Sequence, residues 1–461
     1  MNNKKHSIPR GTRDFSPAET ARRNYIFDTV RGVFALYGYG EIETPAMETL
    51  GTLTGKYGDE GDKLLFRVLD SGNFLADVSD EEIATRDARM LSSRICGKGL
   101  RYDLTVPFAR YVAMHRDEIV FPFRRCQIQP VWRADRPQHG RYREFCQCDA
   151  DIVGSDSLLC EAELLRMADD VFTRLGIRVE IKMNNRKVLA GMAEAIGAAD
   201  KLTAVTVAID KLEKAGKAKV EDELRACGLN DCAIRAIGDM LAIDGSNDDK
   251  LNAADVMLKD NATGLRGIDE ARAVIAALAD ADLNNNVTVD FSLARGLDYY
   301  TGAIFEVKAL DTPMGSISGG GRYDNLTGVF GLPGTSGVGI SFGADRIYDV
   351  LGALNLFPKR TVAGTQLLFV NFGRDEALCA MAHAAAMRQA GIRTEVYPDT
   401  VKTKKQMAYA NAKGIPFVAL VGANEMATGS ITLKDMTTGE QRQLSRDETI
   451  NTIKKATDDE R

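Results

Sequence analysis

The chain has 461 residues, of which 44% are hydrophobic, and its 65 Asp and Glu against 59 Lys and Arg give a formal net charge of −6. These values are typical of a folded protein of roughly three domains, and they exclude a strongly basic nucleic-acid binder. No apolar run approaches the roughly 20 residues that cross a bilayer, and the N-terminus lacks the apolar centre of a signal peptide, so we expect a cytoplasmic protein without a membrane partner. Eight cysteines without a C-x-x-C pair predict reduced thiols rather than disulfides or a zinc site.

In chain order, the first predicted element is a helix that begins at SPAE (16–19). This sequence combines an N-cap serine, a proline at the first helical position and a glutamate at the third. Apolar residues then recur at helical spacing until Gly38. A turn-and-strand signal ends at Pro45, and from 120 to 153 short strand-like runs flank the polar loop ADRPQHG. The latter pattern predicts two antiparallel strands joined by a long loop.

The middle of the chain changes composition. A helix near 158–175 and the strand VEIKMN precede a stretch that is rich in Ala, Leu, Lys and Asp and poor in aromatic residues, which predicts a helical insertion over 187–286. Strand signals return in VTVDFSL and AIFEVKAL, so the chain is expected to leave one sheet and later rejoin it. The insertion holds 12 Lys and Arg against 18 Asp and Glu, and its net charge of −6 argues against a general phosphate clamp.

The last hundred or so residues alternate strands and helices. LLFVNF, TEVYP and FVALVG are expected strands, with helices near 376–389 and 402–413, a hairpin in ITLKDMTTGEQRQLS and a final helix near 446–455. This alternation predicts a separate, compact α/β domain. Lys402, Lys404 and Lys405 fit either anticodon phosphates or a solvated helix face.

Several common signatures are missing. Neither G-x-G-x-x-G nor G-x-x-x-x-G-K-[ST] occurs, so no dinucleotide fingerprint and no P-loop is predicted. The four histidines show no ligand spacing and are interpreted as surface or packed residues: His6, His115, His139 and His383.

Chemistry instead concentrates in four polar segments: LRYDLTVPFARY (100–111), VWRADRPQHGRYREFCQCDADIVG (131–154), ARGLDYYTG (294–302), and SGGGRYDNL with GADRI (318–326 and 343–347). Residues 121–146 alone hold six Arg against two acids. Arginine forks suit phosphate oxygens, and aspartate and tyrosine suit an amine-bearing ligand. Each arginine taken alone fits a structural ion pair equally well.

Taken together, these segments resemble the histidyl-tRNA synthetase family of class II aminoacyl-tRNA synthetases along essentially the full length. PRGTRDF (9–15) is similar to the family's opening signature, the segment ending at Pro45 to motif 1, VWRADRPQHGRYREF to motif 2 and GVGISFGADRI to motif 3. ARGLDYYTG and SGGGRYDNL are similar to two peptides peculiar to the histidine enzymes.

The resemblance implies an α+β fold with four segments. A class II antiparallel-sheet catalytic core spans 1–186 and 287–355, a helical insertion spans 187–286, and a C-terminal α/β anticodon-binding domain spans 362–461. It also implies a homodimer, with Pro45 and its neighbours as the expected interface.

The implied reaction is ATP- and Mg²⁺-dependent activation of L-histidine, followed by transfer to histidine tRNA. The resemblance assigns catalysis to Arg133 and Arg295, and ATP binding to Arg133, Asp135, Arg141, Asp345 and Arg346. It assigns histidine binding to Asp103, Thr105, Gln147, Asp151, Tyr299, Tyr300 and Tyr323, and the tRNA acceptor end to Arg136 and Gln138. Metal ligands are left unassigned. Asp151 and Asp345 depart from the pattern, since many relatives carry the longer glutamate at these positions.

The alternative is a synthetase-like regulatory or histidine-sensing subunit that does not charge tRNA. Such a protein would not need the full arginine set or the C-terminal domain, and both are present. Charging of a different amino acid is disfavoured by the two histidine-type peptides.

Overall fold

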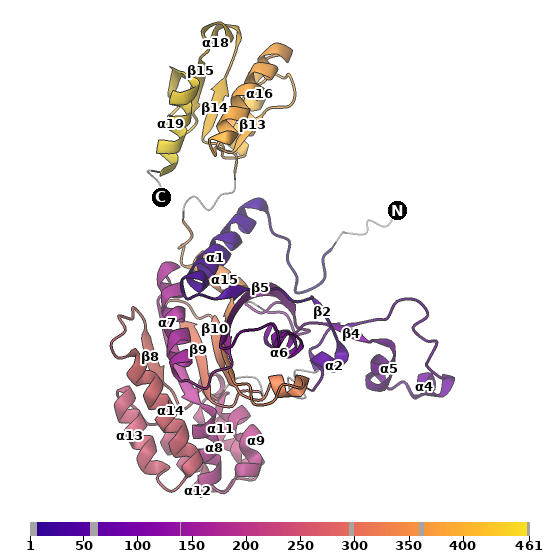
Figure 1. Ribbon diagram of the computed structural model, residues 1–461, viewed down its shortest axis with the longest axis vertical. Coiled ribbons are helices and arrows are strands. Elements are labelled where there is room, and N and C mark those ends of the chain that lie inside the picture. The colour runs from indigo at the N-terminus through magenta and orange to yellow at the C-terminus, as the bar shows by residue number, and fades with distance from the viewer. Residues whose placement is uncertain (1–6, 56–62, 139, 295–298, 359–363, 459–461) are drawn as a thin grey trace. The chain divides into compact units, whose positions relative to one another are not determined.

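The computed structural model describes residues 7–55, 63–138, 140–294, 299–358 and 364–458 (Figure 1). They fall into two compact units, one formed from the ranges 1–14 and 23–357 and the other from 15–22 and 358–461. Among the described residues, no helix is long and apolar enough to cross a membrane.

The first helix, α1 (Pro17–Leu36), confirms the prediction made from its capping sequence. The Ser16 amide donates to Glu19 Oε2 at 2.7 Å, and the Glu19 amide donates to Ser16 Oγ at 3.4 Å. Gly38 follows the helix with φ +78°, a conformation in which glycine carries no steric penalty. The apolar stripe of the helix is buried at Ile26, Val30, Val33 and Phe34.

The larger unit is built on one eight-stranded sheet with the order β1-β5-β6-β11-β10-β9-β7-β8. Two of its pairs, β1·β5 and β7·β8, are parallel and the others are antiparallel. The strands are β1 (Gly40–Glu41), β5 (Phe123–Trp132), β6 (Glu144–Val153), β7 (Val179–Asn185), β8 (Asn286–Val289), β9 (Ala303–Ala309), β10 (Ser318–Tyr323) and β11 (Gly337–Gly343). β5 and β6 are the predicted antiparallel strands with a long loop between them, and β8 returns the chain to the sheet beside β7.

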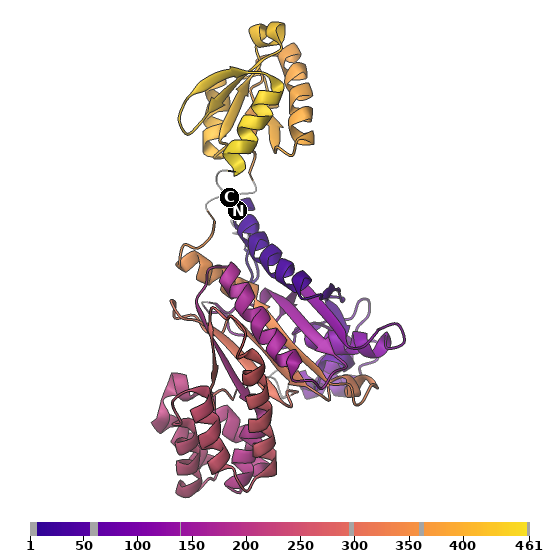
Figure 2. The ribbon, with the colours of Figure 1, turned by 60° about the vertical axis from the view of Figure 1, so that its left-hand side comes forward.

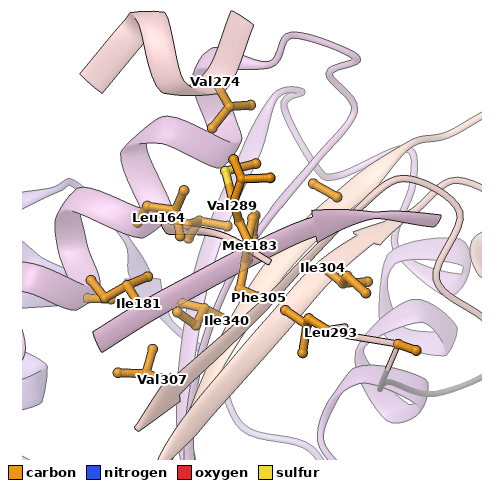
Figure 3. Packing of buried hydrophobic residues seen from close by; sticks show 14 of the residues in the cluster. Leu164, Ile181, Met183, Val274, Val289, Leu293, Ile304, Phe305, Val307 and Ile340 are labelled. Atoms are coloured by element: carbon orange, nitrogen blue, oxygen red, sulfur yellow. The ribbon is translucent and has the colours of Figure 1, made fainter. Parts of the chain in front are cut away.

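Helices cover one face of this sheet. Leu164 on α7 (Leu159–Arg174) and Val274 on α14 (Ala262–Leu278) lie above Met183 and Val289 of the neighbouring strands β7 and β8 (Figure 3). Burying these apolar side chains stabilises the sheet from that side. Side chains alternate between the two faces of a sheet along each strand. Every second residue of β6, β11 and β10 therefore faces the side opposite these helices, where the polar segments gather.

Between β7 and β8 the described chain is helical, as its composition predicted, and the helices gather in one bundle (Figure 2). The bundle contains α8 (Arg186–Ala195), the 3₁₀ turn η1 (Ala199–Lys201), α9 (Leu202–Ile209), α10 (Leu212–Ala215), α11 (Lys217–Ala226), α12 (Asp231–Leu241), α13 (Asn247–Met257) and α14. A Cβ added at Gly191 on α8 would lie 2.4 Å from the Cα of Gly264 on α14. Glycine at both positions thus lets these two helices pack backbone to backbone.

The stretch before β5, which the sequence left as mixed, forms a small three-stranded sheet of order β2-β4-β3 with short helices. Its elements are β2 (Met47–Thr49), α2 (Leu50–Leu53), β3 (Arg67–Val68), α4 (Asp80–Thr85), α5 (Ala88–Ile95), β4 (Lys98–Leu100) and α6 (Thr105–Met114). After β10, the 3₁₀ turn η2 (Thr327–Phe330) leads to β11, and α15 (Ala344–Ala353) follows it.

The C-terminal unit has its own five-stranded sheet of order β13-β12-β14-β15-β16. The bounds are β12 (Leu367–Phe369), α16 (Arg374–Gln389), β13 (Thr394–Val396), α17 (Thr403–Ala412), β14 (Phe417–Leu420), α18 (Ala423–Thr428), β15 (Ile431–Asp435), β16 (Gln441–Leu444) and α19 (Arg446–Asp458). Every predicted element is present, and α18 is the addition that the sequence reading did not anticipate.

Candidate active site

A cavity of about 440 Å³ lies on the polar face of the central sheet. It is lined from the loop between β5 and β6, from β10 and β11, and from the start of α15. Eleven of the predicted site residues line it: Asp103, Thr105, Arg133, Asp135, Gln138, Arg141, Gln147, Tyr299, Tyr300, Asp345 and Arg346.

The remaining predicted residues lie elsewhere. Asp151 and Tyr323 are buried beside the cavity and do not line it, and Arg136 is exposed on the loop between β5 and β6. Arg295 lies outside the residues that the structure describes. In the C-terminal unit, Lys402, Lys404 and Lys405 are exposed.

Strand register places the polar residues in rows across the sheet. Asp151 on β6 pairs with Arg125 on β5 and with Gly339 on β11, which pairs with Gly321 on β10. The next row holds Gln127, Asp149, Ser341, Gly319 and Glu306, in the order β5-β6-β11-β10-β9. Because side chains alternate along a strand, both rows face the same side.

The glycines of β10 and β11 hollow this face. A Cβ added at Gly339 would lie 2.0 Å from Asp151 Oδ1, and one at Gly321 would lie 2.9 Å from the ring of Tyr300. At Gly337 it would lie 2.3 Å from the ring of Tyr323. The missing side chains therefore make the space that the carboxylate and the two tyrosines occupy.

Three of the residues that line the cavity are arginines. The side chain of Arg133 lies over the ring of Tyr102 at 4.3 Å and donates from Nε to the Tyr102 carbonyl at 3.1 Å. Arg346 donates to the carbonyls of Gly140 and Ser316, at 2.8 and 2.5 Å. Arg141 pairs with Asp135 at 2.5 Å while remaining nearly half exposed. Arginines in a cavity wall can bind the oxygens of a polyphosphate.

Asp345, which also lines the cavity, pairs with two further arginines. Its Oδ1 accepts from Arg23 at 2.5 Å and also pairs with Arg13, and its Oδ2 accepts from the Cys146 amide at 2.8 Å. Arg13 also lies 3.7 Å over the ring of Tyr142, which itself lines the cavity. Sequence reasoning missed Arg13 and Arg23 as site residues; the PRGTRDF signature was the available signal for Arg13.

The cavity is also lined by a carboxylate and two tyrosines. Asp103 is buried and accepts from the Val106 amide at 3.1 Å and from the Tyr299 hydroxyl at 3.2 Å. Tyr299 and Tyr300 meet edge to face at 5.0 Å. Burial raises the pKa of the Tyr300 hydroxyl, and the nearby carboxylates of Asp151 and Asp103 raise it further, so this hydroxyl stays protonated as a donor.

Three further residues of this region were not predicted. Lys214 of the helical insertion lines the cavity together with Glu306, so the insertion contributes directly to the site. Arg101 is buried and donates to the Thr44 carbonyl at 2.6 Å, to the Pro130 carbonyl at 2.8 Å and to Gln129 Oε1 at 2.9 Å. It thereby fixes the segment that ends at Pro45 against β5, two residues before Asp103.

Comparison with known proteins gives separate evidence on the family of this chain. The family model described as histidyl-tRNA synthetase matches residues 11–95 and 97–347, and the one described as anticodon binding domain matches residues 367–456. The chain is 60% identical over 451 residues to a histidine–tRNA ligase of Bacteroides fragilis, covering 98% of this chain and 99% of that protein. It is 59% identical over 443 residues to one of Porphyromonas gingivalis, covering 96% and 98%.

Solved structures agree with these matches. The histidyl-tRNA synthetase from Nostoc sp. PCC 7120 superimposes with a TM-score of 0.82 at 31% identity and covers 98% of this chain and 99% of its own. An ATP phosphoribosyltransferase regulatory subunit/histidyl-tRNA synthetase from Bacillus halodurans C shares the fold, with a TM-score of 0.71 at 19% identity, covering 90% and 97%.

Proposed function

This chain belongs to the histidyl-tRNA synthetase family and is a histidine–tRNA ligase, and from that premise we propose how its residues divide the reaction. Relatives that are 60% identical over nearly the full length are histidine–tRNA ligases, which favours tRNA charging over the regulatory alternative. The observation that carries the proposal is a single cavity lined by three arginines, Arg133, Arg141 and Arg346, together with Asp103, Tyr299 and Tyr300.

Arg133, Arg141 and Arg346 bind the phosphates of ATP. A carboxylate oxygen of histidine attacks the α-phosphorus, a new P–O bond forms, and the bond to pyrophosphate breaks with its electron pair. Arg133 neutralises the charge that develops on the α-phosphate, so the protein needs to supply positioning and charge rather than a nucleophile. Arg295 is proposed as the second catalytic residue on the family resemblance alone.

Asp135 and Asp345 serve ATP indirectly in this proposal. Asp135 orients Arg141 through their 2.5 Å ion pair, and Asp345 fixes the N-terminal arginines. Mg²⁺ fits the remaining chemistry, because this ion keeps several waters and binds mainly through substrate phosphates with one or two carboxylates. Glu306, a cavity-lining carboxylate beside Ser316, is the proposed protein contribution, and the ion would offset phosphate charge.

Asp103 and Thr105 bind the α-amino group of histidine, with Gln147 close to the amino-acid backbone. Tyr299 and Tyr300 form the wall of the imidazole pocket. Asp151 and Tyr323, which are joined by a 2.6 Å hydrogen bond, support this wall from behind. A ligand without ring nitrogens would leave buried polar groups unpaired, which is a strong source of discrimination.

The tRNA and the second subunit are the proposed partners, in the cytoplasm. Arg136 and Gln138, exposed on the loop between β5 and β6, are the candidates for the acceptor end, and residues 362–461 for the anticodon. The core is proposed to span 1–186 and 287–355, with the insertion at 187–286. Pro45 and the neighbouring Met47, which is 53% exposed on an edge strand, support a homodimer interface.

The test of the proposed reaction is exchange of labelled pyrophosphate into ATP with each standard amino acid in turn and no tRNA. Exchange that depends on histidine alone is expected, followed by charging of histidine tRNA. Exchange with another amino acid, or histidine binding without exchange, would contradict the proposal. Light scattering coupled to gel filtration tests the homodimer, which a single-chain mass would rule out.

A further inference from the structure

A buried arginine lies close to the residues that are proposed to bind histidine. Arg125 on β5 is 0% exposed, its Nη2 lies 2.7 Å from Asp151 Oδ2, and its guanidinium lies 4.2 Å over the ring of Phe108. Its three guanidinium nitrogens have no aligned hydrogen-bond partner among the described residues. Burying a cation this way is costly, and an ion pair alone repays the cost poorly.

Both carboxylate oxygens of Asp151, the partner of Arg125, contact a neighbouring side chain. Asp151 Oδ2 faces Arg125, and Asp151 Oδ1 accepts from the Tyr323 hydroxyl at 2.6 Å. Asp151 is not among the residues that line the cavity, so we argue its effect on a ligand through the groups that it holds.

Contacts between tyrosine rings connect Asp151 to the wall of the cavity. The ring of Tyr323 meets that of Tyr299 edge to face at 6.1 Å, and Tyr299 meets Tyr300 at 5.0 Å. Tyr300 also lies over Gly321, whose strand partner Gly339 lies under Asp151. Arg125, Asp151 and the three tyrosines thus form one contiguous chain of contacts.

A second carboxylate makes this arrangement depend on charge. Asp149 Oδ2 lies 4.0 Å from Arg125 Nη2, and Asp149 is as deeply buried as Asp151. Without the arginine, the two buried carboxylates would lie together without a cation and would share a proton more tightly. A protonated or displaced Asp151 would lose its fixed orientation toward Tyr323.

We infer that Arg125 is a positioning residue for histidine recognition, which pairs with Asp151 and orients it so that Tyr323, Tyr299 and Tyr300 keep the shape of the imidazole pocket. The inference rests on the proposed function, in which Tyr299 and Tyr300 contact the imidazole. Supporting groups of this kind behind a binding site typically change affinity or activity by about 10- to 100-fold in metal centres, and we expect a similar range here.

The experiment measures KM for histidine, KM for ATP and kcat by pyrophosphate exchange in Arg125→Met and Arg125→Lys. Arg125→Met is expected to raise KM for histidine at least about tenfold, with KM for ATP changed less than about twofold. Arg125→Lys, which restores the charge, should recover at least half of the loss on a logarithmic scale. Asp149→Asn in the Arg125→Met background should also recover part of it, because it removes the competing carboxylate.

Arg124→Met is the matched control, since Arg124 is the next residue of the same strand and pairs with Glu163 at 3.1 Å on the other face. It should leave both KM values unchanged. Equal changes in both KM values of Arg125→Met, or a lysine variant no better than methionine, would overturn the inference. If Arg125→Met does not fold, Arg125→Lys decides: a rise of threefold or more in KM for histidine alone supports positioning, and no rise refutes it.

Histidine-dependent exchange by the unmodified protein distinguishes failure of the proposed function from failure of the inference about Arg125. Its absence would refute the proposed function itself. Its presence, combined with an unaltered KM for histidine in folded Arg125→Met, would refute only the role of Arg125.

Discussion

Replacing Gly339 by alanine is predicted to weaken histidine binding selectively. The new Cβ would lie 2.0 Å from Asp151 Oδ1 and 2.5 Å from Asp151 Cγ, whereas real Cβ atoms essentially never approach closer than 3.0 Å. The carboxylate must therefore move by about 1 Å or more. Its 2.6 Å hydrogen bond from Tyr323 and its 2.7 Å contact with Arg125 would then exceed hydrogen-bonding distance.

Overpacking a filled site costs about 1–3 kcal/mol. If about 2 kcal/mol of this cost falls on the imidazole pocket, KM for histidine rises roughly 30-fold, since about 1.4 kcal/mol is a factor of ten. Pyrophosphate exchange should show this rise with KM for ATP within about twofold, because the arginines proposed to bind ATP are not among the contacts of Asp151 described above: Arg133, Arg141 and Arg346.

Gly352→Ala on α15 is the matched control, because a Cβ there meets nothing within 4 Å. It should leave the kinetics unchanged and stabilise the helix by about 0.5–1 kcal/mol. A Gly339→Ala protein with normal KM for histidine, or with histidine and ATP affected alike, would refute the link from β11 through Asp151 to the pocket.

Three further predictions concern charge. Arg133→Met should lower kcat for exchange by on the order of 10²-fold with KM for histidine nearly unchanged, because charge on the α-phosphate grows in the transition state; an unchanged kcat would remove Arg133 from catalysis. Asp345→Asn should raise KM for ATP about tenfold by releasing Arg13 and Arg23, whereas Asp349→Asn, whose contact with Arg13 is longer at 3.4 Å, should have a smaller effect; equal effects would contradict the anchoring role. Burial raises the pKa of Asp149 from 3.8 to about 7, so the folded protein holds a proton that the unfolded chain has released, and this contribution to stability, full below about pH 4, is lost as pH rises through 7. Urea midpoints measured from pH 5 to 8 should therefore fall less steeply in Asp149→Asn, and identical slopes in the two proteins would contradict this sign.

Local signals predicted much of the fold. The capping box at Ser16 and Glu19 located α1, because capping depends on residues three apart in sequence. The hairpin of β5 and β6 and nearly all of the C-terminal unit were likewise predicted from strand periodicity and turn residues. The glycine-rich strands β10 and β11 were not, because glycine has low strand propensity. Glycine is needed in these strands because of how closely they pack. A Cβ at Gly320 would lie 2.0 Å from the Gly339 carbonyl oxygen.

The candidate site, like the fold, was predicted from the sequence only in part. Most of the residues that line the cavity lie in segments that the sequence singles out, with Lys214 and Glu306 as exceptions, whereas the residues that support them carry no local signal. Arg125 belongs to the sequence run FRRC, which does not indicate a partner, and only strand register reveals that it faces Asp151. Arg13 and Asp345 are separated by 332 positions, so no local pattern connects them.

The order of strands in the central sheet has a consequence for how the protein is made. β11 lies between β6 and β10, and Asp345 immediately after it completes the anchor for Arg13 and Arg23. A nascent chain that has passed β10 but not β11 therefore exposes the long edge of β6 with nothing to pair it. Contacts that close over such distances along the chain form slowly and leave sheet edges open to aggregation. The ribosome must thus deliver nearly three quarters of this polypeptide before the cavity on the central sheet exists, and translation that stalls earlier yields a product that holds the loop between β5 and β6 but cannot assemble the cavity.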